Sequence, residues 1–395
     1  MLGGFGTMAA VPTPQESSRS RRWASTMRGF RAGSHVTLAH ATSSARIEPA
    51  HDGTDGSLGI DRARREEREA TTLAVGATRA VGAGARRVDE EPDPWRTCFE
   101  RDRDRILHSS SFRRLAGKTQ VFIFPEDHQR TRLSHALEVA QIAGGIARAV
   151  GLNVALAEAI ALGHDCGHGP GGHASEDALD PYVEGGFDHA PWGADVSLAS
   201  LNLCAETLDG IANHSWSRTA PTTPEGEVVS WADRIGYVCH DFEDAVSARI
   251  VTPDQLPAVV VERCGTRRGE QLGKFIDAMV ATVLATGVIG MDAEFAEALA
   301  AFREFNYERI YLRDESVAQG EAVVTVLRAL VEYFTAHRNE IPERADAHGA
   351  VDHRDGDPVF EAVRYVAGMT DRFAFRTAVS DLGFDANDLP KGVDR

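Results

Sequence analysis

The stretch from Ala155 to Glu176 constrains this chain more than any other. It opens with an apolar run, which predicts a helix over 155–163, and passes directly into His164 and Asp165. A glycine-rich loop follows and carries two more histidines and a glutamate. An imidazole and a carboxylate at a helix end can both reach one metal ion, and glycines leave the backbone free to approach a ligand. This pattern is typical of a binding or catalytic site and not of a hydrophobic core.

Two further segments supply candidate metal ligands. Residues 131–150 have the apolar periodicity of a helix and carry a histidine near their start, and residues 228–250 predict a long helix with several polar positions on one stripe. Two imidazoles and two carboxylates suit a divalent metal that keeps open positions for water and a substrate oxygen. The predicted ion is Mn, Mg, Fe, Co, Ni or Zn. The predicted ligands are His135, His164, Asp165 and Asp233.

Composition narrows the class of protein. The chain has 395 residues, of which 43% are hydrophobic, and a net charge of -17. An acidic surface disfavours nucleic-acid binding, so small molecules are the expected partners. The five cysteines form no CxxC pair, which fits a reducing compartment. No apolar run approaches the ~18 residues of a membrane span, so we expect a cytoplasmic protein without membrane partners.

The sequence predicts an all-α fold, because helical patterns dominate and no alternation of strands and helices occurs. At most a short β-ribbon is expected near 117–125, where β-branched and aromatic residues cluster. Residues 1–86 lack apolar periodicity and are predicted to be a disordered extension. We expect a catalytic core over 87–255 and a helical C-terminal region over 256–395 that packs on it.

The order of the predicted ligands, H then HD then D, resembles the HD phosphohydrolase superfamily. Five longer motifs resemble its deoxyguanosine triphosphate triphosphohydrolase branch more closely, and the likeness extends from about residue 93 to 382. These motifs are Ser109–Phe122, Arg130–His135, Leu162–Glu176, Ala232–Tyr237 and Arg364–Phe373.

The resemblance implies the helical HD-domain fold and a homo-oligomer. It also implies metal-dependent hydrolysis of a deoxynucleoside triphosphate (dNTP) to the deoxynucleoside and inorganic triphosphate, by attack of water on the α-phosphorus. The implied catalytic residues are His173, Glu176 and His189. The implied substrate contacts are Arg132 and His168 at the phosphates, Tyr237 where a ribose 2′-hydroxyl would lie, and Asp241 at the 3′-hydroxyl. Arg234 stands where the family frequently has Asp or Lys, and its positive charge is compatible with a further phosphate contact.

Two alternatives remain open. One is an HD-domain nucleotide phosphomonoesterase or phosphodiesterase, which would release phosphate or a monophosphate instead of triphosphate. The other is a catalytically weak regulatory paralogue. It draws support from the residues after His189, because Ala190-Pro191-Trp192 stands where the resembling family commonly has Asn or Glu. No residue of the sequence identifies a preferred base.

Overall fold

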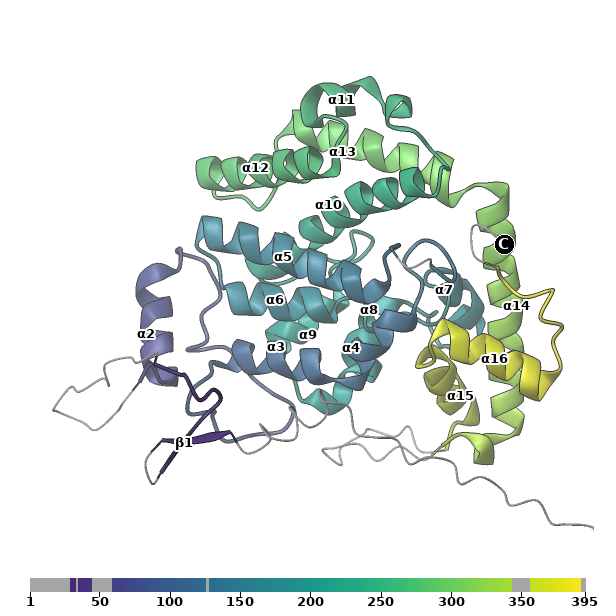
Figure 1. Cartoon of the computed structure of the whole chain (residues 1–395), viewed down its shortest axis with the longest axis horizontal. Coiled ribbons are helices and arrows are strands. Elements are labelled where there is room, and N and C mark those ends of the chain that lie inside the picture. Colours follow the sequence, from purple (N-terminus) through teal and green to yellow (C-terminus); the bar gives the residue numbers. More distant parts are fainter. Residues whose placement is uncertain (1–28, 33–34, 45–58, 126–127, 343–355, 392–395) are drawn as a thin grey trace, which may run out of the picture. The chain divides into compact units, whose positions relative to one another are not determined.

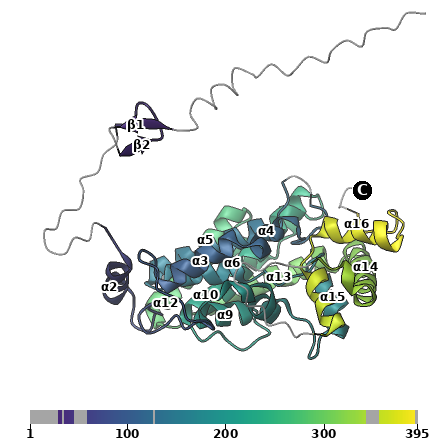
Figure 2. The same ribbon diagram turned by 90° about the horizontal axis from the view of Figure 1, so that it is seen from below.

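The computed structural model describes residues 29–32, 35–44, 59–125, 128–342 and 356–391, and divides the chain into two units, 1–59 and 60–395. In the first unit, β1 (Phe30–Ala32) pairs antiparallel with β2 (Val36–Leu38), as Figure 2 shows. These described residues therefore differ from the predicted disorder. For residues 1–28 and 45–58 that prediction lies outside the described residues.

The second unit is built from helices (Figure 1), which confirms the predicted all-α class. Short 3₁₀ and π turns connect several of them. The α-helices are α2 (Arg62–Thr72), α3 (Cys98–His108), α4 (Ser110–Arg114), α5 (Arg132–Val150), α6 (Val154–Gly163), α7 (Ala174–Leu179), α8 (His189–Trp192), α9 (Ala205–Ala212), α10 (Pro224–Ser247), α11 (Ala258–Cys264), α12 (Arg268–Thr286), α13 (Ala293–Asn306), α14 (Asp314–Ala336), α15 (Pro358–Ala367) and α16 (Asp371–Leu382).

The predicted strand near 117–125 is absent. Within this segment only Thr119 forms a β-bridge, to Thr131, and the following residues form bends. The backbone N–H and the hydroxyl of Thr119 both donate to Asp371, at 2.9 and 2.5 Å. The β-branched and aromatic side chains instead pack against the helices, so they fill the core without a partner strand.

Residues 60–86 belong to the folded unit, so the predicted boundary at residue 86 is wrong. Arg86 forms a buried ion pair with Asp102 of α3 at 2.7 Å. The N–H of Thr78 donates to Glu225 of α10, and Ala80 is buried. Polar contacts and one buried ion pair hold this segment, and apolar periodicity does not reveal such contacts.

Two hydrophobic clusters organise the second unit. The first joins α3, α5 and α6 to α9–α13, and the second joins α7 to α14–α16. The same grouping is visible in Figure 1, where α14, α15 and α16 lie together beside the helices of the first cluster. The predicted boundary at 255/256 has no counterpart, because α11–α13 share the first cluster with the core helices. The helix predicted to continue through 358–382 is interrupted, since α15 ends at Ala367 and α16 begins at Asp371.

The helices that carry the predicted ligands have defined ends. The Thr131–Ser134 capping box starts α5, and Gly151 ends it in the left-handed conformation, with φ 77°. Thr223 caps α10, which begins with a proline at its first position. His135 therefore lies in the first turn of α5, and His164 directly follows the last residue of α6. Within the described residues, every helix is too short or too polar to cross a bilayer.

Candidate active site

The four predicted metal ligands converge from three helices. Nε2 of His135 lies 2.9 Å from Oδ1 of Asp233, and Nε2 of His164 lies 3.6 Å from that same oxygen. His164 also lies 3.6 Å from Oδ1 of Asp165, and His135 lies 4.0 Å from its Oδ2. His164 Nδ1 donates to the Ala161 carbonyl at 2.7 Å, which leaves Nε2 facing both carboxylates. The structure thus brings these residues into one cluster.

The charges of this cluster suit a divalent cation. Although burial by itself would raise the pKa of Asp165, Arg132 and the neighbouring histidines hold it well below its usual range. Despite burial, hydrogen bonds from His135 and His164 hold the pKa of Asp233 well below its usual range. Against burial, these two carboxylates raise the pKa of His164 to about 9. A dication would take the place of that proton, so the donor set fits a metal whose binding releases a proton.

Arg132 lies one turn before His135 and is buried. One of its terminal nitrogens donates to Oδ2 of Asp165 at 2.7 Å, whereas its Nε and other terminal nitrogen have no hydrogen-bond partner among the described residues. A buried guanidinium with two unpaired donors is suited to bind an anion. A Cβ at residue 172 would lie 2.9 Å from that free nitrogen, so Gly172 keeps the approach open.

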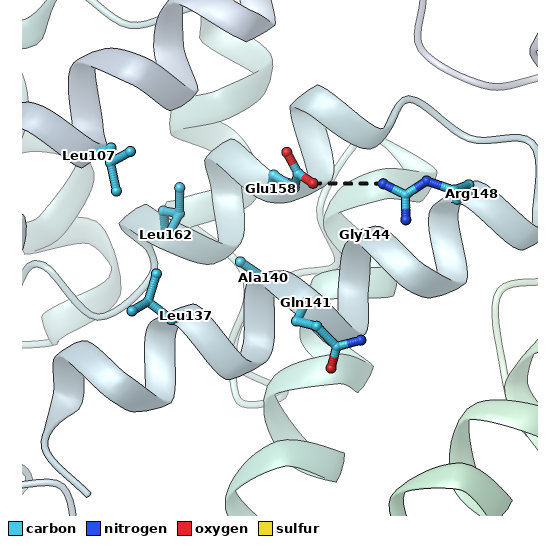
Figure 3. A pocket seen from close by; sticks show the side chains of 8 residues that line it. All are labelled: Leu107, Leu137, Ala140, Gln141, Gly144, Arg148, Glu158 and Leu162. Atoms are coloured by element: carbon cyan, nitrogen blue, oxygen red, sulfur yellow. Dashed lines mark ion pairs between the residues drawn. The ribbon is translucent and has the colours of Figure 1, made fainter. Parts of the chain in front are cut away.

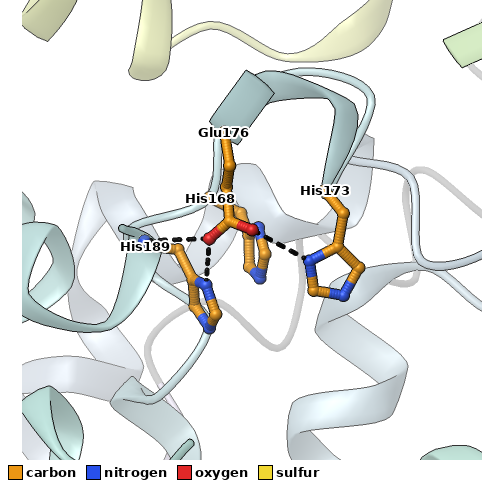
Figure 4. A group of neighbouring side chains, drawn as sticks. All are labelled: His168, His173, Glu176 and His189. Atoms are coloured by element: carbon orange, nitrogen blue, oxygen red, sulfur yellow. Dashed lines mark hydrogen bonds and ion pairs between the residues drawn. The ribbon is translucent and has the colours of Figure 1, made fainter. Parts of the chain in front are cut away.

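Glu176 joins two histidines of a second group of side chains (Figure 4). Its Oε2 accepts from Nδ1 of His173 at 3.2 Å, and its Oε1 accepts from Nδ1 of His189 at 2.6 Å. Despite burial, these two hydrogen bonds hold the pKa of Glu176 well below its usual range. Because an ionised carboxylate only accepts, both imidazoles carry their proton on Nδ1 and turn Nε2 away from it.

His168 completes this group. Its ring stacks on that of His189 with centroids 3.7 Å apart, and its Nε2 lies 3.1 Å from Oδ1 of Asp165. Burial and the adjacent Arg132 hold the pKa of His168 well below its usual range. His173 differs from the others because its side chain is 75% exposed, so it can meet a molecule that enters from solvent.

Residues far away in the sequence hold the glycine loop in place. The side-chain nitrogen of Lys118 is buried and donates to the carbonyls of His168 and Ala367. Asp371 accepts from the N–H of Gly171 at 2.9 Å. A Cβ at residue 167 would lie 1.9 Å from the His189 carbonyl oxygen, so only glycine permits this close approach.

The sequence prediction missed His214, which follows α9. Its ring centroid lies 4.9 Å from that of His164, and its Nε2 lies 3.2 Å from Nε2 of His189. Burial and these two histidines lower the pKa of His214 to about 3. No motif marks this residue, and only its position at a helix end could have suggested it.

The stripe along α10 continues from Asp233 to Tyr237 and Asp241. Arg303 of α13 donates to the Tyr237 hydroxyl at 2.7 Å, and Tyr311 donates to Oδ2 of Asp241 at 2.5 Å. Oδ1 of Asp241 is buried without a hydrogen-bond partner among the described residues. Burial raises the pKa of Asp241 to about 8, against the effect of the Tyr311 hydrogen bond. This carboxyl group is therefore incompletely paired within the protein.

Arg234 lies beside this stripe and stacks on Trp216. Its guanidinium carbon is 3.4 Å from the centroid of the Trp216 ring. The ring of Trp216 in turn meets that of Trp231 edge to face, with centroids 4.6 Å apart. A phosphate contact by Arg234 would have to compete with this cation–π interaction.

A groove of about 420 Å³ lies outside the cluster, between α3, α5 and α6 (Figure 3). Its lining is mostly apolar, including Leu107 and Leu137, with Arg148 and Glu158 at one end. None of the predicted site residues lines this groove. We therefore base the candidate active site on the histidine and carboxylate cluster.

Comparison with known proteins identifies the family of the chain that carries this cluster. Residues 132–237 match the HD domain, and residues 289–379 match the phosphohydrolase-associated domain. The chain is 39% identical over 316 residues to a deoxyguanosinetriphosphate triphosphohydrolase-like protein of Caldanaerobacter subterraneus, which covers 78% of this chain and 92% of the relative. It is 40% identical over 301 residues to a protein of the same name from Clostridium perfringens, covering 72% and 86%. The chain belongs to the deoxyguanosinetriphosphate triphosphohydrolase-like family.

Membership in this family makes the chain an HD-domain phosphohydrolase. The matched HD domain begins at Arg132 and ends at Tyr237, so it includes all four predicted metal ligands. The HD domain is a metal-dependent phosphohydrolase fold, and the described cluster has donors that can hold a metal. The predicted hydrolase class is thus confirmed, whereas the substrate and the role of each residue stay predictions.

Proposed function

We propose that this phosphohydrolase converts a dNTP to the deoxynucleoside and inorganic triphosphate. One observation carries the proposal: Arg132 donates to Asp165, one of the four predicted metal ligands, and two of its buried guanidinium nitrogens have no hydrogen-bond partner among the described residues. A metal and an arginine side by side are the groups that neutralise a phosphoryl oxygen during attack by water. The relatives' printed names support a deoxynucleotide as the source of that phosphate.

The metal held by His135, His164, Asp165 and Asp233 would supply Lewis-acid polarisation of an α-phosphate oxygen and a bound water. The chain's own residues contribute the remaining parts. Arg132 binds the phosphates through its Nε and free terminal nitrogen. His168, whose Nε2 lies 3.1 Å from Oδ1 of Asp165, would contact the same phosphates, whereas Arg234 would have to leave its stacked position on Trp216 to reach them.

His173 is the group best suited to transfer a proton. Glu176 accepts from its Nδ1, which fixes the ring orientation and leaves Nε2 free at an exposed position. Glu176 is therefore a positioning residue for His173. The expected role of His189, as an acid near the leaving 5′-oxygen, stays a prediction.

Side chains on the α10 stripe would contact the sugar and select it. Residues 233, 237 and 241 follow one another at steps of about 6 Å along the helix axis, in the direction from phosphate to sugar. Tyr237 would exclude a 2′-hydroxyl by crowding, and Oδ1 of Asp241 would accept from the 3′-hydroxyl. Loss of that hydroxyl would leave a buried oxygen unpaired, which gives the site its selectivity.

The test is incubation of the pure protein with each dNTP and Mn²⁺, followed by separation of the products by anion exchange. The proposal expects deoxynucleoside and triphosphate, with the matching ribonucleotide and the dideoxy analogue hydrolysed more slowly. Release of phosphate or a monophosphate would favour an HD-domain phosphomonoesterase or phosphodiesterase. Absence of turnover with bound metal would favour a regulatory paralogue. A homo-oligomer, a cytoplasmic location and the absence of nucleic-acid partners also stay predictions.

A further inference from the structure

Trp216 is a partly exposed tryptophan in the connection between α9 and α10, with an exposed fraction of 45%. Its Nε1 donates to the carbonyl of Ser230 at 3.1 Å, and its ring meets that of Trp231 edge to face. Both partners belong to α10. The indole is therefore held in one orientation against this helix, although almost half of its surface is open to solvent.

The charged group of Arg234 lies over this ring. Its guanidinium carbon is 3.4 Å from the centroid of the Trp216 ring. Arg234 follows Trp231 by three positions, so both side chains extend from the same side of α10. Arg234 also directly follows Asp233, a predicted metal ligand. Its backbone thus lies next to the candidate metal cluster, whereas its charge lies against an aromatic ring outside that cluster.

The charge of Arg234 has no ion-pair partner among the described residues. Asp233 forms its ion pairs with two histidines instead. On the other side, Arg303 of α13 donates to the hydroxyl of Tyr237 at 2.7 Å. Burial and the positive charge of Arg303 hold the pKa of Arg234 below its ordinary value, against the effects of Tyr237 and Asp233. Stacking on Trp216 therefore stabilises a cation that is available to bind an anion.

We propose that Trp216 is a positioning residue, which keeps Arg234 away from the substrate phosphates in the free protein and releases it when a triphosphate group binds. This inference rests on the proposed function, because it takes those phosphates as the anion that Arg234 meets. Arg132 differs in this respect, since its hydrogen bond to Asp165 already holds it at the cluster. Arg132 is thus preorganised for the phosphates, whereas Arg234 is recruited by them.

The two positions of Arg234 are close enough in free energy for such an exchange. A cation–π contact at a partly exposed site shifts an equilibrium by about 2–5-fold. A charge-assisted hydrogen bond to a phosphate oxygen is stronger than a neutral one, so a bound triphosphate can displace the stacked position. Because each binding event then includes the loss of the stack, removal of the ring should tighten binding by about the same 2–5-fold.

The test measures the Kd of inorganic triphosphate for the full-length, Mn²⁺-loaded protein by titration calorimetry. Trp216→Leu removes the aromatic ring and should lower this Kd by about 2–5-fold. Trp216→Phe keeps an aromatic face and should bind as the wild type does. Trp95→Leu is the matched control, because Trp95 is 55% exposed and lies outside the site, and it should leave the Kd unchanged. A purely structural role of Trp216 would weaken binding, so tighter binding distinguishes the positioning role.

A double-mutant comparison assigns the effect to Arg234. In an Arg234→Ala background, Trp216→Leu should no longer change the Kd, because the cation that the ring holds is gone. An unchanged Kd in folded Trp216→Leu protein would overturn the proposal. An equal decrease of the Kd with and without Arg234 would overturn it as well.

A measurement on the wild type covers the case in which Trp216→Leu does not fold. In fluorotryptophan-labelled protein, the fluorine NMR signal of Trp216, assigned with Trp216→Phe, should shift when triphosphate binds and should not shift in Arg234→Ala. An unshifted wild-type signal at saturation would overturn the proposal.

The product assay measures dNTP hydrolysis separately. Unchanged Kd values in an active hydrolase would refute the role of Trp216 alone, and the expected Kd values without hydrolysis would refute the proposed function alone.

Discussion

The active site has two halves that differ in how the chain holds them. The helix-borne half consists of His135, His164, Asp165 and Asp233, and its residues lie on or directly after helices of 19, 10 and 24 residues. The loop-borne half consists of His168, His173, His189 and His214, and lies in loops and at the ends of shorter helices. Figure 4 shows how Glu176 joins two members of the loop-borne half.

The two halves also differ in what fixes their side chains. Packing of α5, α6 and α10 in the first hydrophobic cluster fixes the helix-borne half. The loop-borne half depends on single hydrogen bonds, on Lys118 and Asp371 beneath the loop, and on a backbone approach that excludes a side chain at residue 167. We therefore expect metal binding by the helix-borne half to tolerate changes in the loops, whereas turnover should not.

The largest effect on bound metal and hydrolysis is expected at Asp165, where the two halves meet. Asp165 lies 4.0 Å from His135 and 3.1 Å from His168, so its carboxylate serves both halves. Asp165→Ala should lose all bound metal and all hydrolysis, because it also leaves Arg132 buried without its anion. Metal analysis and the product assay measure this. Asp277→Ala, at an exposed position of α12, is the control, and full metal content in the Asp165 variant would contradict the shared role.

Substitution of the exposed His173 should distinguish the role of the helix-borne half in metal binding from the role of the loop-borne half in turnover. His173→Ala is expected to keep its bound metal but to lower kcat by ~10²–10⁴, the range for loss of a general acid or base. Bound metal and kcat are measured on the same preparation, with His108→Ala, at an exposed position of α3, as the control. Loss of bound metal would instead make His173 a metal ligand.

The sequence named every residue of the helix-borne half and three of the four histidines of the loop-borne half. A helix predicted over 131–150 is observed at Arg132–Val150, because its apolar residues recur with the period of a helix. His214 was missed because its partner His189 is remote in sequence, and no local pattern encodes that contact. Residues 60–86 were misjudged for a similar reason, since polar contacts such as the Arg86–Asp102 ion pair hold them.

A methyl group can test how tightly the loop-borne half is packed. In Gly167→Ala the new Cβ would lie 1.9 Å from the His189 carbonyl oxygen and 2.5 Å from the Gly193 nitrogen. Both are backbone atoms, so the loop must shift, and the free energy of unfolding should fall by about 1–3 kcal/mol. Denaturant unfolding measures this change.

Gly145→Ala is the matched control for this change. Gly145 lies within α5, and the nearest atom to its added Cβ is the side-chain nitrogen of Gln141 at 3.8 Å. Alanine should leave stability unchanged or raise it by about 0.5–1 kcal/mol, because glycine weakens a helix interior. Equal stability of the two variants would show that the loop tolerates displacement and would weaken the contrast between the halves.

An effect of comparable size, on substrate selectivity, is expected at the far end of the α10 stripe. Asp241→Asn keeps the size of the side chain but replaces its carboxyl group with an amide, so discrimination between a dNTP and its 3′-deoxy analogue should shrink by about 1–3 kcal/mol. The ratio of kcat/KM for the two substrates measures this, and bound metal should not change. An unaltered ratio would remove the sugar contact from Asp241 while leaving the metal cluster untouched.

The smallest expected effect is a pH dependence of the free energy of unfolding. It arises from Lys118, which lies beneath the loop-borne half. Burial lowers the pKa of Lys118 from 10.5 to about 7 in the folded protein. Between these values the unfolded chain binds more protons than the folded one, so stability rises with pH from about 7 upward. One proton is worth up to about 1.4 kcal/mol per pH unit, so the first unit above 7 should add about 1 kcal/mol.

Lys118→Met should lack this increase, whereas Lys274→Met, at an exposed position of α12, should retain it. If Lys118→Met keeps the full slope, Lys118 is charged in the folded protein and binds the carbonyls of His168 and Ala367 as a cation. The loop-borne half would then rest on a buried charge, and its support would be stronger than the comparison of the two halves assumes.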